Sequence, residues 1–400
     1  MKIGIMLRHF DQHRGGVKNY TNYLLNELFA LNSSHEFILI YSNSKHMGTY
    51  KNFKNVREIA VNISNRILWD QLAMPYVQKK EKLDIIYNPK YSIPLFLRCP
   101  AVFVCHGLDW YLMPWGSKIV DRMIHKFLFP QYTIKATSII AVSNTTREHL
   151  MEFLNVNKEK IYTIYEGMHE SFKEDIPKEE LERIRAKHNL PEKFFLFAGQ
   201  IYPPKNFGRI LQAYAKVGPK QGIHLVATGE HRWLCEDELN MIKELEISKW
   251  VIRPGWIDEY SLICTYKLAE ALVIPSLYES FCTPIAEAMA TGCPVITSNR
   301  FGTKEVAGNA AILVNPESIE NIADAMQKIL IDKDLKEDLI KKGFERANQF
   351  SWKKAATETL GVLEKTVKSP VVKGLHVKIF KLKDKDKILL IKRPKKLSPI

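Results

Sequence analysis

Short apolar runs alternate with longer amphipathic segments along most of this chain of 400 residues, and this alternation limits the possible folds more than any other feature. Each run has the length of a buried strand, and strands that alternate with helices form a mostly parallel sheet. The alternation stops over residues 165–192 and then resumes. We therefore predict an α/β protein with two such sheets. The predicted strands are 2–7, 37–41, 101–105, 138–142 and 161–164 in the first sheet, and 194–198, 224–228, 250–253, 271–274 and 294–297 in the second.

The chain is long enough, and at 46% hydrophobic residues apolar enough, to bury two cores of ordinary size. We expect an N-terminal domain over residues 1–168, a linker over 169–192 and a C-terminal domain over 193–351. Because doubly wound parallel sheets have this pattern of strands and helices, both domains are predicted to be Rossmann-like.

One stretch of the second domain, 278–300, holds two carboxylates, Glu279 and Glu287, eight residues apart. Thr is a favoured N-cap and Pro is tolerated in the first turn, so we expect a helix to start at Pro284 with Thr283 as its cap. The free N–H groups of that turn would face a loop that follows a parallel strand, where open α/β sheets bind ligands. This stretch therefore predicts an anion site with a carboxylate on each side.

Two glycine turns also precede predicted helices. Gly15 and Gly16 follow the first strand of the chain, and Gly199 follows the first strand of the second domain, with Gln200 and Lys205 before the next helix. Glycine lets backbone N–H groups approach a phosphate closely, and a lysine at a helix N-terminus is favourable when an anion lies between them. The alternatives are a purely structural turn for the glycines and a solvated side chain for Lys205.

His106 follows the apolar run 102–105 and begins a polar segment that ends at Asp109. A histidine at the carboxyl end of a strand is a candidate catalytic residue, because its charge changes near neutral pH. The alternative is a structural histidine whose hydrogen bonds are satisfied within the fold.

The formal charge of +14 is concentrated at the C-terminus. Residues 365–400 hold twelve Lys or Arg and two Asp, a net charge of +10, interleaved with Ile, Leu and Phe. Such a segment fits adhesion to anionic lipid, at roughly 1 kcal/mol per cation near the surface. A solvated tail and a nucleic-acid-binding segment are the alternatives, but the aromatic platforms of nucleic-acid readers are not evident. We therefore expect a basic tail over 366–400 that contacts an anionic membrane, and no nucleic-acid partner.

Three features bear on location. The first residues enter an apolar strand without the longer run of a signal peptide, and no stretch of eighteen apolar residues occurs. The six cysteines lack the close spacing of a metal site or a disulfide framework. We expect a cytoplasmic protein that can lie peripherally on the cytoplasmic face of a membrane.

Taken together, these segments resemble the family 4 retaining glycosyltransferases, which have the two-domain GT-B architecture and use nucleotide-diphosphate sugars. The most specific element is the E-x(7)-E pattern from Glu279 to Glu287, followed by Ala-Met-Ala-Thr-Gly-Cys-Pro-Val-Ile. The resemblance covers about residues 1–365 and leaves the tail outside. The supporting elements are Gly15-Gly16 with Tyr20, 105–109, 141–143, Gly199 with Lys205-Asn206, 255–257, 275–279 and 350–352.

The resemblance implies roles for the matching residues. Glu287 would bind the ribose hydroxyls, Lys205 the diphosphate and Glu279 the donor sugar, with His106 facing the sugar at the reacting centre. His106 and Glu279 are the implied catalytic residues, and a last helix over 352–365 would cross back to the N-terminal domain. The implied donor-binding residues are Gly15, Gly16, Gly199, Gln200, Lys205, Phe281, Cys282, Thr283, Pro284 and Glu287, and the base-binding residues are Trp256 and Ile257.

This sequence departs from the family pattern in two places. The family often carries an Arg beside the diphosphate, where this chain has Gln200 and Pro204, so that Arg14 or Arg232 would have to substitute. Cys282 occupies a position where Gly is usual, and its side chain is expected to narrow the sugar pocket.

The implied activity is retaining transfer of a hexose from GDP-mannose or a UDP-sugar to a glycan or lipid-linked glycan, in polysaccharide or glycoconjugate biosynthesis. The lean toward GDP-mannose rests on residues 69–75, which resemble a segment common in mannosyltransferase-like members. No acidic pair is placed to hold a divalent ion in the site, so we expect no metal and no cofactor. The alternatives are a nucleotide-sugar epimerase of the same architecture and a catalytically weak relative that binds partners through the basic tail.

Overall fold

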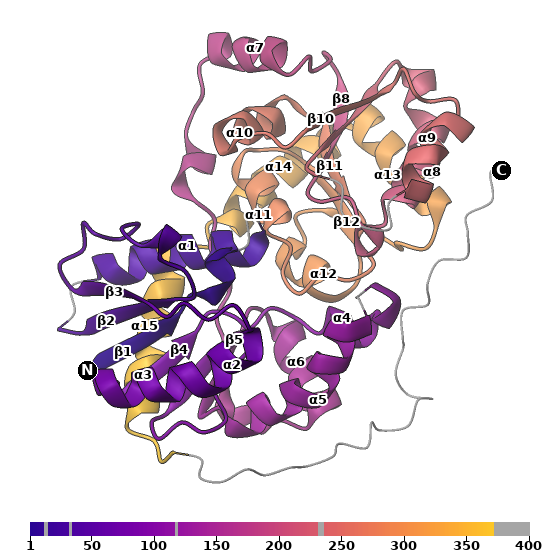
Figure 1. Ribbon diagram of the computed structural model, residues 1–400. Helices are drawn as coiled ribbons and strands as arrows, with labels where there is room; N and C mark the ends of the chain where they lie inside the picture. The colour runs from indigo at the N-terminus through magenta and orange to yellow at the C-terminus, as the bar shows by residue number, and fades with distance from the viewer. Residues whose placement is uncertain (12–14, 32–33, 117–118, 231–235, 372–400) are drawn as a thin grey trace. The chain divides into compact units, whose positions relative to one another are not determined.

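The computed structural model describes residues 1–11, 15–31, 34–116, 119–230 and 236–371. These residues form two compact units, one made of Met1–Gly167 with residues 351–371 and the other of Met168–Phe350 (Figure 1). Each unit is an α/β domain around a parallel sheet, which confirms the predicted fold class. None of the helices within these ranges is both long enough and apolar enough to cross a membrane.

The first unit contains, among its described residues, a seven-stranded parallel sheet in the order β3-β2-β1-β4-β5-β6-β7. Its strands are β1 (Lys2–Met6), β2 (Glu36–Tyr41), β3 (Val56–Ala60), β4 (Ile85–Asn88), β5 (Ala101–Cys105), β6 (Ser138–Ala141) and β7 (Ile161–Thr163). Its main helical elements are η1 (Arg8–Asp11), α1 (Gly16–Ala30), α2 (Arg66–Leu68), the π-helix η3 (Trp69–Ala73), α3 (Met74–Glu81), α4 (Asp109–Leu112), α5 (Ile119–Lys135), α6 (Asn144–Leu154) and α15 (Trp352–Val367).

Both faces of this sheet are buried, which is why its strands read as continuous apolar runs. In β2, the Ile38 side chain belongs to the core that packs against α3, α5 and α6. The preceding residue, Phe37, points to the other face of the sheet, where its ring centroid lies 5.0 Å from that of Phe29 in α1. Helix α15 contacts α1 and the strands β4, β5 and β6. The alternation of side chains along each strand thus places one helical layer on each face.

The second unit contains, within its described residues, a six-stranded parallel sheet in the order β10-β9-β8-β11-β12-β13. Its strands are β8 (Phe194–Ala198), β9 (His224–Thr228), β10 (Val251–Gly255), β11 (Ala271–Ile274), β12 (Val295–Ser298) and β13 (Ile312–Val314). Its main helices are η6 (Glu170–Lys173), α7 (Lys178–Lys187), η7 (Pro203–Lys205), α8 (Phe207–Val217), α9 (Glu236–Glu244), α10 (Glu259–Leu268), α11 (Thr283–Ala290), α12 (Phe301–Ala307), α13 (Ile319–Ile331) and α14 (Lys333–Ala347).

Every predicted strand is present, and three strands that the sequence did not indicate to us are added. Strand β3 is only partly buried and carries the charged pair Arg57 and Glu58 at its centre. Strands β4 and β13 have four and three residues. Short strands of this kind are specified by pairing with their neighbours rather than by their own sequence.

Residues 169–192, which we expected to be a linker, are grouped with the second unit. The short helix η6 contacts α11, and α7 packs on α10. Phe172 and Ile184 are buried there. This segment is therefore an integral layer of the second unit rather than a free connection.

The last described helix, α15, belongs to the first unit. The Trp352 indole lies 5.4 Å from the ring of Tyr20, and a Cβ atom on Gly167 would come within 2.2 Å of the Trp352 nitrogen. At the other end, Thr366 and Ser138 share a hydrogen bond of 2.8 Å between their hydroxyls. Because α15 runs to Val367, the expected start of the tail at residue 366 is corrected. The remainder of the expected tail, 372–400, lies outside the described residues.

Candidate active site

The strand order of the second unit reverses between β8 and β11, the paired strands at the centre of its sheet. In open α/β sheets, the loops that leave the carboxyl ends of such strands diverge to opposite faces and open a binding crevice. Gly199 and Lys205 follow β8, and Glu279 follows β11. The structure thus brings these three predicted residues to one place.

Lys205 and Glu279 form an ion pair at this point. The Lys205 Nζ lies 2.5 Å from the Glu279 Oε1, and the two side chains are only 11% and 13% exposed. Burial is the largest single effect and disfavours the ammonium, but the Glu279 carboxylate and smaller contributions from neighbouring groups together outweigh it, and the pKa of Lys205 is raised. Lys205 is therefore held in its charged form without any bound anion.

The turn after β8 leaves room beside Lys205. Gly199 has a φ of 131°, and a Cβ atom placed on it would lie 4.0 Å from the Lys205 Nζ. Asn206, which follows in the left-handed region, donates from Nδ2 to the Pro275 carbonyl at 3.0 Å. This hydrogen bond ties the start of α8 to the end of β11 and fixes Lys205 between them. Gln200 is half-buried beside the same turn.

The loop that carries Glu279 is held by α12. The Gly302 N–H donates to the Glu279 carbonyl at 3.0 Å. A Cβ atom on Gly302 would come within 2.3 Å of the Ser280 carbonyl oxygen and 2.7 Å of that of Glu279. Only glycine therefore permits this approach, and it sets the position of Glu279.

Helix α11 begins one residue earlier than we expected. Cys282 occupies the N-cap position with φ 81° and ψ 69°, and Thr283 is the first helical residue, followed by Pro284. The prediction of Thr283 as the cap is therefore wrong: a residue in the left-handed region already turns the chain into the helix. This conformation favours glycine, which accounts physically for the glycine usual at this position in the resembling family.

The Cys282 side chain is buried next to the ion pair. Burial, and then the Glu279 carboxylate, raise the pKa of the Cys282 thiol, so it stays neutral near pH 7. Phe281, its neighbour, points into the core and meets the ring of Phe350 edge-on at 5.3 Å. Of this turn, Phe281 can offer only its backbone to a ligand, as the resemblance implies.

Glu287 lies one turn into α11 and is oriented by a residue that sequence reasoning missed. The Tyr266 hydroxyl donates to the Glu287 Oε2 at 2.9 Å. Burial, and then the Glu287 carboxylate, raise the pKa of Tyr266 well above its ordinary value, so the phenol remains a donor. Tyr266 lies on α10, twenty-one residues earlier, and no sequence pattern connects the two.

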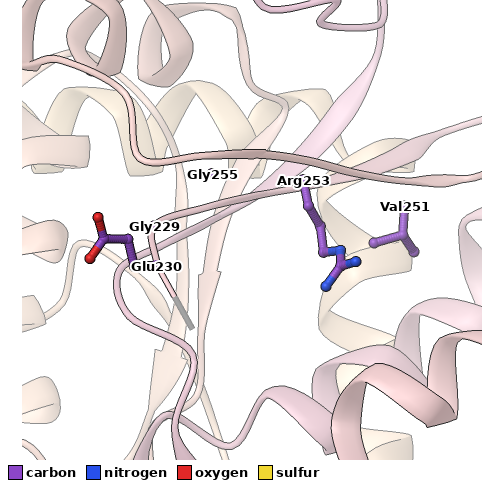
Figure 2. Close-up of a pocket in the computed structure, with 5 residues that line it drawn as sticks. All are labelled: Gly229, Glu230, Val251, Arg253 and Gly255. Atoms are coloured by element: carbon purple, nitrogen blue, oxygen red, sulfur yellow. The ribbon is translucent and has the colours of Figure 1, made fainter. Parts of the chain in front are cut away.

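Within the described residues, a hollow is lined by Gly229 and Glu230, which follow β9, and by Val251, Arg253 and Gly255 of β10. Figure 2 shows the Glu230 and Arg253 side chains on opposite sides of it.

The predicted base-binding residues Trp256 and Ile257 directly follow β10. Trp256 is 53% exposed, whereas Ile257 is buried. The exposed ring of Trp256 can therefore stack on a base, whereas the buried Ile257 side chain supports the loop from inside the protein.

In the first unit, His106 follows β5 and is nearly buried. Its Nε2 donates to the Pro89 carbonyl at 2.8 Å, and its Nδ1 lies 3.6 Å from the Glu166 Oε1. The Tyr20 ring meets the imidazole edge-on at a centroid distance of 4.6 Å. Glu166, which sequence reasoning also missed, is thus the carboxylate that faces His106.

Gly15 and Gly16 open α1, and Gly15 has a φ of 151°. A Cβ atom on either glycine would meet nothing within 4 Å. The described residues therefore leave room beside the start of α1. Arg14 and Arg232, the suggested substitutes for the missing arginine, lie outside the described residues. Within the described ranges, no cluster of His, Cys, Asp and Glu is arranged to hold a metal ion.

Two family models match this chain in tandem. The model described as Glycosyltransferase Family 4 matches residues 14–172, and the model described as Glycosyl transferases group 1 matches residues 179–346. The chain belongs to the group 1, family 4 glycosyltransferases. The second match contains Gly199, Lys205, Glu279 and Glu287, which the fold brings to the switch point of the second unit.

Similar proteins agree with this family. The O-antigen chain mannosyltransferase B of Escherichia coli is 27% identical over 281 residues, which cover 69% of this glycosyltransferase and 73% of that protein. The serotype-specific mannosyltransferase WbdA of E. coli is 26% identical over 339 residues, and these cover 79% of this chain but only 39% of WbdA.

Solved structures show the same GT-B fold. A glycosyltransferase from Rickettsia africae aligns with a TM-score of 0.73 at 18% identity, covering 92% of this chain and 99% of its own. The Anabaena protein HepE, in complex with UDP and glucose, aligns with a TM-score of 0.72 at 16% identity, covering 91% and 100%. At these identities the likeness concerns the fold alone.

Replacing Gly302 with Ala should displace Glu279 and disable this glycosyltransferase. The added Cβ atom overlaps backbone oxygens that cannot rotate away, so the loop must shift. We expect kcat/KM for sugar transfer to fall about 100-fold, because a displacement of roughly 1 Å can have that effect. The melting temperature should also fall, since overpacking costs about 1–3 kcal/mol.

The matched control is Gly361→Ala in α15, where an added Cβ atom meets nothing within 4 Å. This variant should keep full activity and gain stability of about 1 kcal/mol from helix propensity. Wild-type kinetics in Gly302→Ala would contradict the proposed dependence of Glu279 on this contact.

Proposed function

We propose that this glycosyltransferase moves a hexose, with retention, from a nucleoside diphosphate sugar to a glycan or lipid-linked glycan acceptor. The observation that carries the proposal is the Lys205–Glu279 ion pair at the switch point of the second unit. A charged lysine beside an open glycine turn and a helix start is suited to a diphosphate.

On this proposal, the donor replaces one half of the ion pair. Lys205 exchanges the Glu279 carboxylate for the diphosphate, and Glu279 then accepts hydrogen bonds from the sugar hydroxyls. Glu287, oriented by Tyr266, accepts from the ribose hydroxyls. The base lies by Trp256, in or beside the hollow of Figure 2.

The proposed transfer of a sugar depends more on stabilising the leaving diphosphate than on a nucleophile supplied by the protein. As the bond to the diphosphate breaks, negative charge develops there, and Lys205 with the N-terminus of α11 would stabilise it. His106 is proposed as the second catalytic residue, with Glu166 supporting any positive charge on its imidazole. The proposed reaction uses no divalent cation and no cofactor.

The names of the relatives support GDP-mannose as the first donor to test. Several related proteins are named mannosyltransferases of O-antigen chains, whereas HepE holds UDP and glucose. We therefore propose GDP-mannose, with a UDP-sugar as the alternative, and an acceptor in polysaccharide biosynthesis.

A group of exposed apolar side chains supports a membrane-borne acceptor. Leu68, Leu72 and Tyr76 follow one another at four-residue intervals along α2, η3 and α3, and Phe96 lies on a neighbouring loop that Gln71 binds through the Leu95 N–H at 2.8 Å. Leu68, Leu72, Tyr76 and Phe96, here called the apolar face, are 46–66% exposed. Exposed lysines 79 and 80 continue the same segment. Apolar and cationic side chains together favour an anionic lipid surface.

Kinetics of site variants test the proposed donor site. Lys205→Met and Glu279→Gln should each lower kcat/KM for transfer from the donor about 10- to 150-fold, because a charge-assisted hydrogen bond contributes about 1.5–3 kcal/mol. The loss should appear mainly in kcat, since the leaving diphosphate is most negative in the transition state. EDTA should leave the wild-type rate unchanged.

The matched control is Lys216→Met, which removes an exposed lysine of α8 that pairs with Glu320. It should leave the rate unchanged. Wild-type rates in Lys205→Met and Glu279→Gln would contradict the proposed donor site. Absence of transfer by the wild type would favour the binding-only alternative, and conversion of the donor to another sugar without acceptor would favour an epimerase.

Flotation with lipid vesicles tests the membrane proposal. The full chain should float with vesicles that contain anionic phosphatidylglycerol, and removal of residues 372–400 should lower the floated fraction. The double change Leu72→Asp and Tyr76→Asp should lower it further, because apolar area can no longer be buried. Met151→Asp, at another exposed apolar residue of the same unit, is the control. If neither change affects flotation, the proposal fails.

A further inference from the structure

The sheet of the first unit also reverses its strand order at its centre, between the paired strands β1 and β4. By the rule that places Lys205 and Glu279 in the second unit, a ligand crevice is expected where these two strands end. Arg8 and His9 follow β1, and Lys90 follows β4 after a single residue. The described structure has a pocket at this point whose volume of about 10 Å³ admits about one water molecule, so a larger anion would contact its rim rather than enter it.

The pocket is strongly cationic. Among its described lining residues, Arg8, Arg66 and Lys90 carry positive charge, and Asp70 carries the opposing carboxylate. The Asp70 side chain is 3% exposed, and its Oδ1 has no hydrogen-bond partner, nor has the Arg8 Nε that lies 3.7 Å away. Buried polar atoms are normally hydrogen-bonded. A pocket lined by a carboxylate oxygen and a guanidinium nitrogen that both lack a hydrogen-bond partner is therefore suited to a polar ligand.

Among the described residues that line the pocket, three positive groups accompany one carboxylate. Burial lowers the pKa of Arg8, and although Asp70 opposes this effect, the nearby Arg66 adds to it. Burial, and then Lys90, lower the pKa of His9 on the same wall. These positive groups repel one another, and an anion of charge near −2 would relieve this repulsion.

The walls of the pocket are fixed by side-chain to backbone hydrogen bonds. The π-helix η3 supplies both Asp70 and Gln71, and the Gln71 amide binds Ile93 and Leu95 of the loop after β4. The Asn88 Nδ2 donates to the Ser92 Oγ at 3.1 Å. One-turn π-helices occur frequently at functional sites. This π-helix contributes residues to the wall of the pocket as well as to the core.

The pocket adjoins the residue that we propose as catalytic. The carbonyl that accepts the His106 Nε2–H bond at 2.8 Å belongs to Pro89, the residue directly before Lys90. Arg66 begins α2, directly before the first exposed apolar residues of that segment, Ile67 and Leu68. Lys90 of the pocket thus follows the residue that His106 binds, and Arg66 of the pocket begins the segment that carries the apolar face.

We propose that this pocket binds a phosphate or diphosphate group of the acceptor. The inference rests on the proposed function, in which the phosphates of the donor are taken by Lys205 in the second unit. Two guanidinium groups and an ammonium match the charge and the hydrogen-bonding geometry of phosphate. The neighbouring apolar face favours a lipid-linked phosphate over a soluble sugar phosphate as the source.

Binding of inorganic pyrophosphate to the full chain tests the pocket directly. The protein is first saturated with UDP or GDP, whichever raises its melting temperature, so that the donor site is filled. Wild type should then bind pyrophosphate by calorimetry, and Arg66→Gln and Lys90→Gln should each bind it about tenfold more weakly or less, because each loses a charge-assisted contact. These variants leave the Arg8–Asp70 pair intact.

The matched control is Lys54→Gln, which removes an exposed lysine from the loop before β3 and should bind pyrophosphate as wild type does. Equal affinities in all four proteins, or no binding to any, would overturn the inference. Failure of UDP and GDP alike to stabilise the chain would instead count against the proposed function, and the two failures are therefore distinguishable.

Acceptor kinetics separate the two sources of phosphate. Arg66→Gln and Lys90→Gln should raise KM for a phosphorylated acceptor about tenfold while KM for the donor and for a neutral glycoside of the same glycan stays unchanged. With a lipid-linked acceptor, binding of alkyl diphosphates should tighten as the chain lengthens, whereas a soluble sugar phosphate source predicts no dependence on chain length. An unchanged KM for the phosphorylated acceptor would contradict the proposed site.

Discussion

The reversal of strand order at the centre of each parallel sheet decides where this chain can bind a ligand. At β8 and β11 the diverging loops place Lys205 beside Glu279, and at β1 and β4 they place Arg8 and Lys90 around Asp70. Neither group could assemble from neighbouring residues in sequence. The sheet topology therefore fixes where a binding site can form, and the residues of the loops determine which ligand it suits.

The Lys205–Glu279 ion pair places two opposite charges at the candidate site of the second unit. A buried lysine without a counter-charge would tend to lose its proton, and a buried carboxylate would tend to gain one. The pairing at 2.5 Å keeps the Lys205 ammonium charged. In the proposed function, a donor then offers a diphosphate to Lys205 and hydroxyls to Glu279. The surroundings hold this arrangement, because Asn206 anchors the start of α8 and Gly302 anchors the loop of Glu279.

Much of the fold and part of the candidate site could be predicted from the sequence. The features that could not be predicted have identifiable physical causes. The longer apolar strands and the helix after Lys205 follow from the periodicity of apolar residues. The cap of α11 did not, because Cys282 adopts a left-handed conformation that side chains usually avoid. The orienting Tyr266 and the cationic pocket depend on residues brought together by packing, so no local pattern could reveal them.

Calorimetric affinity for UDP or GDP, without any sugar, tests the exchange at Lys205 most directly. If the diphosphate displaces Glu279 from Lys205, Lys205→Met should weaken binding about tenfold or more. Glu279→Gln should strengthen it, because the competing carboxylate and its repulsion of the diphosphate are both removed. Weaker or unchanged binding in Glu279→Gln, or unchanged binding in Lys205→Met, would contradict the proposed diphosphate site.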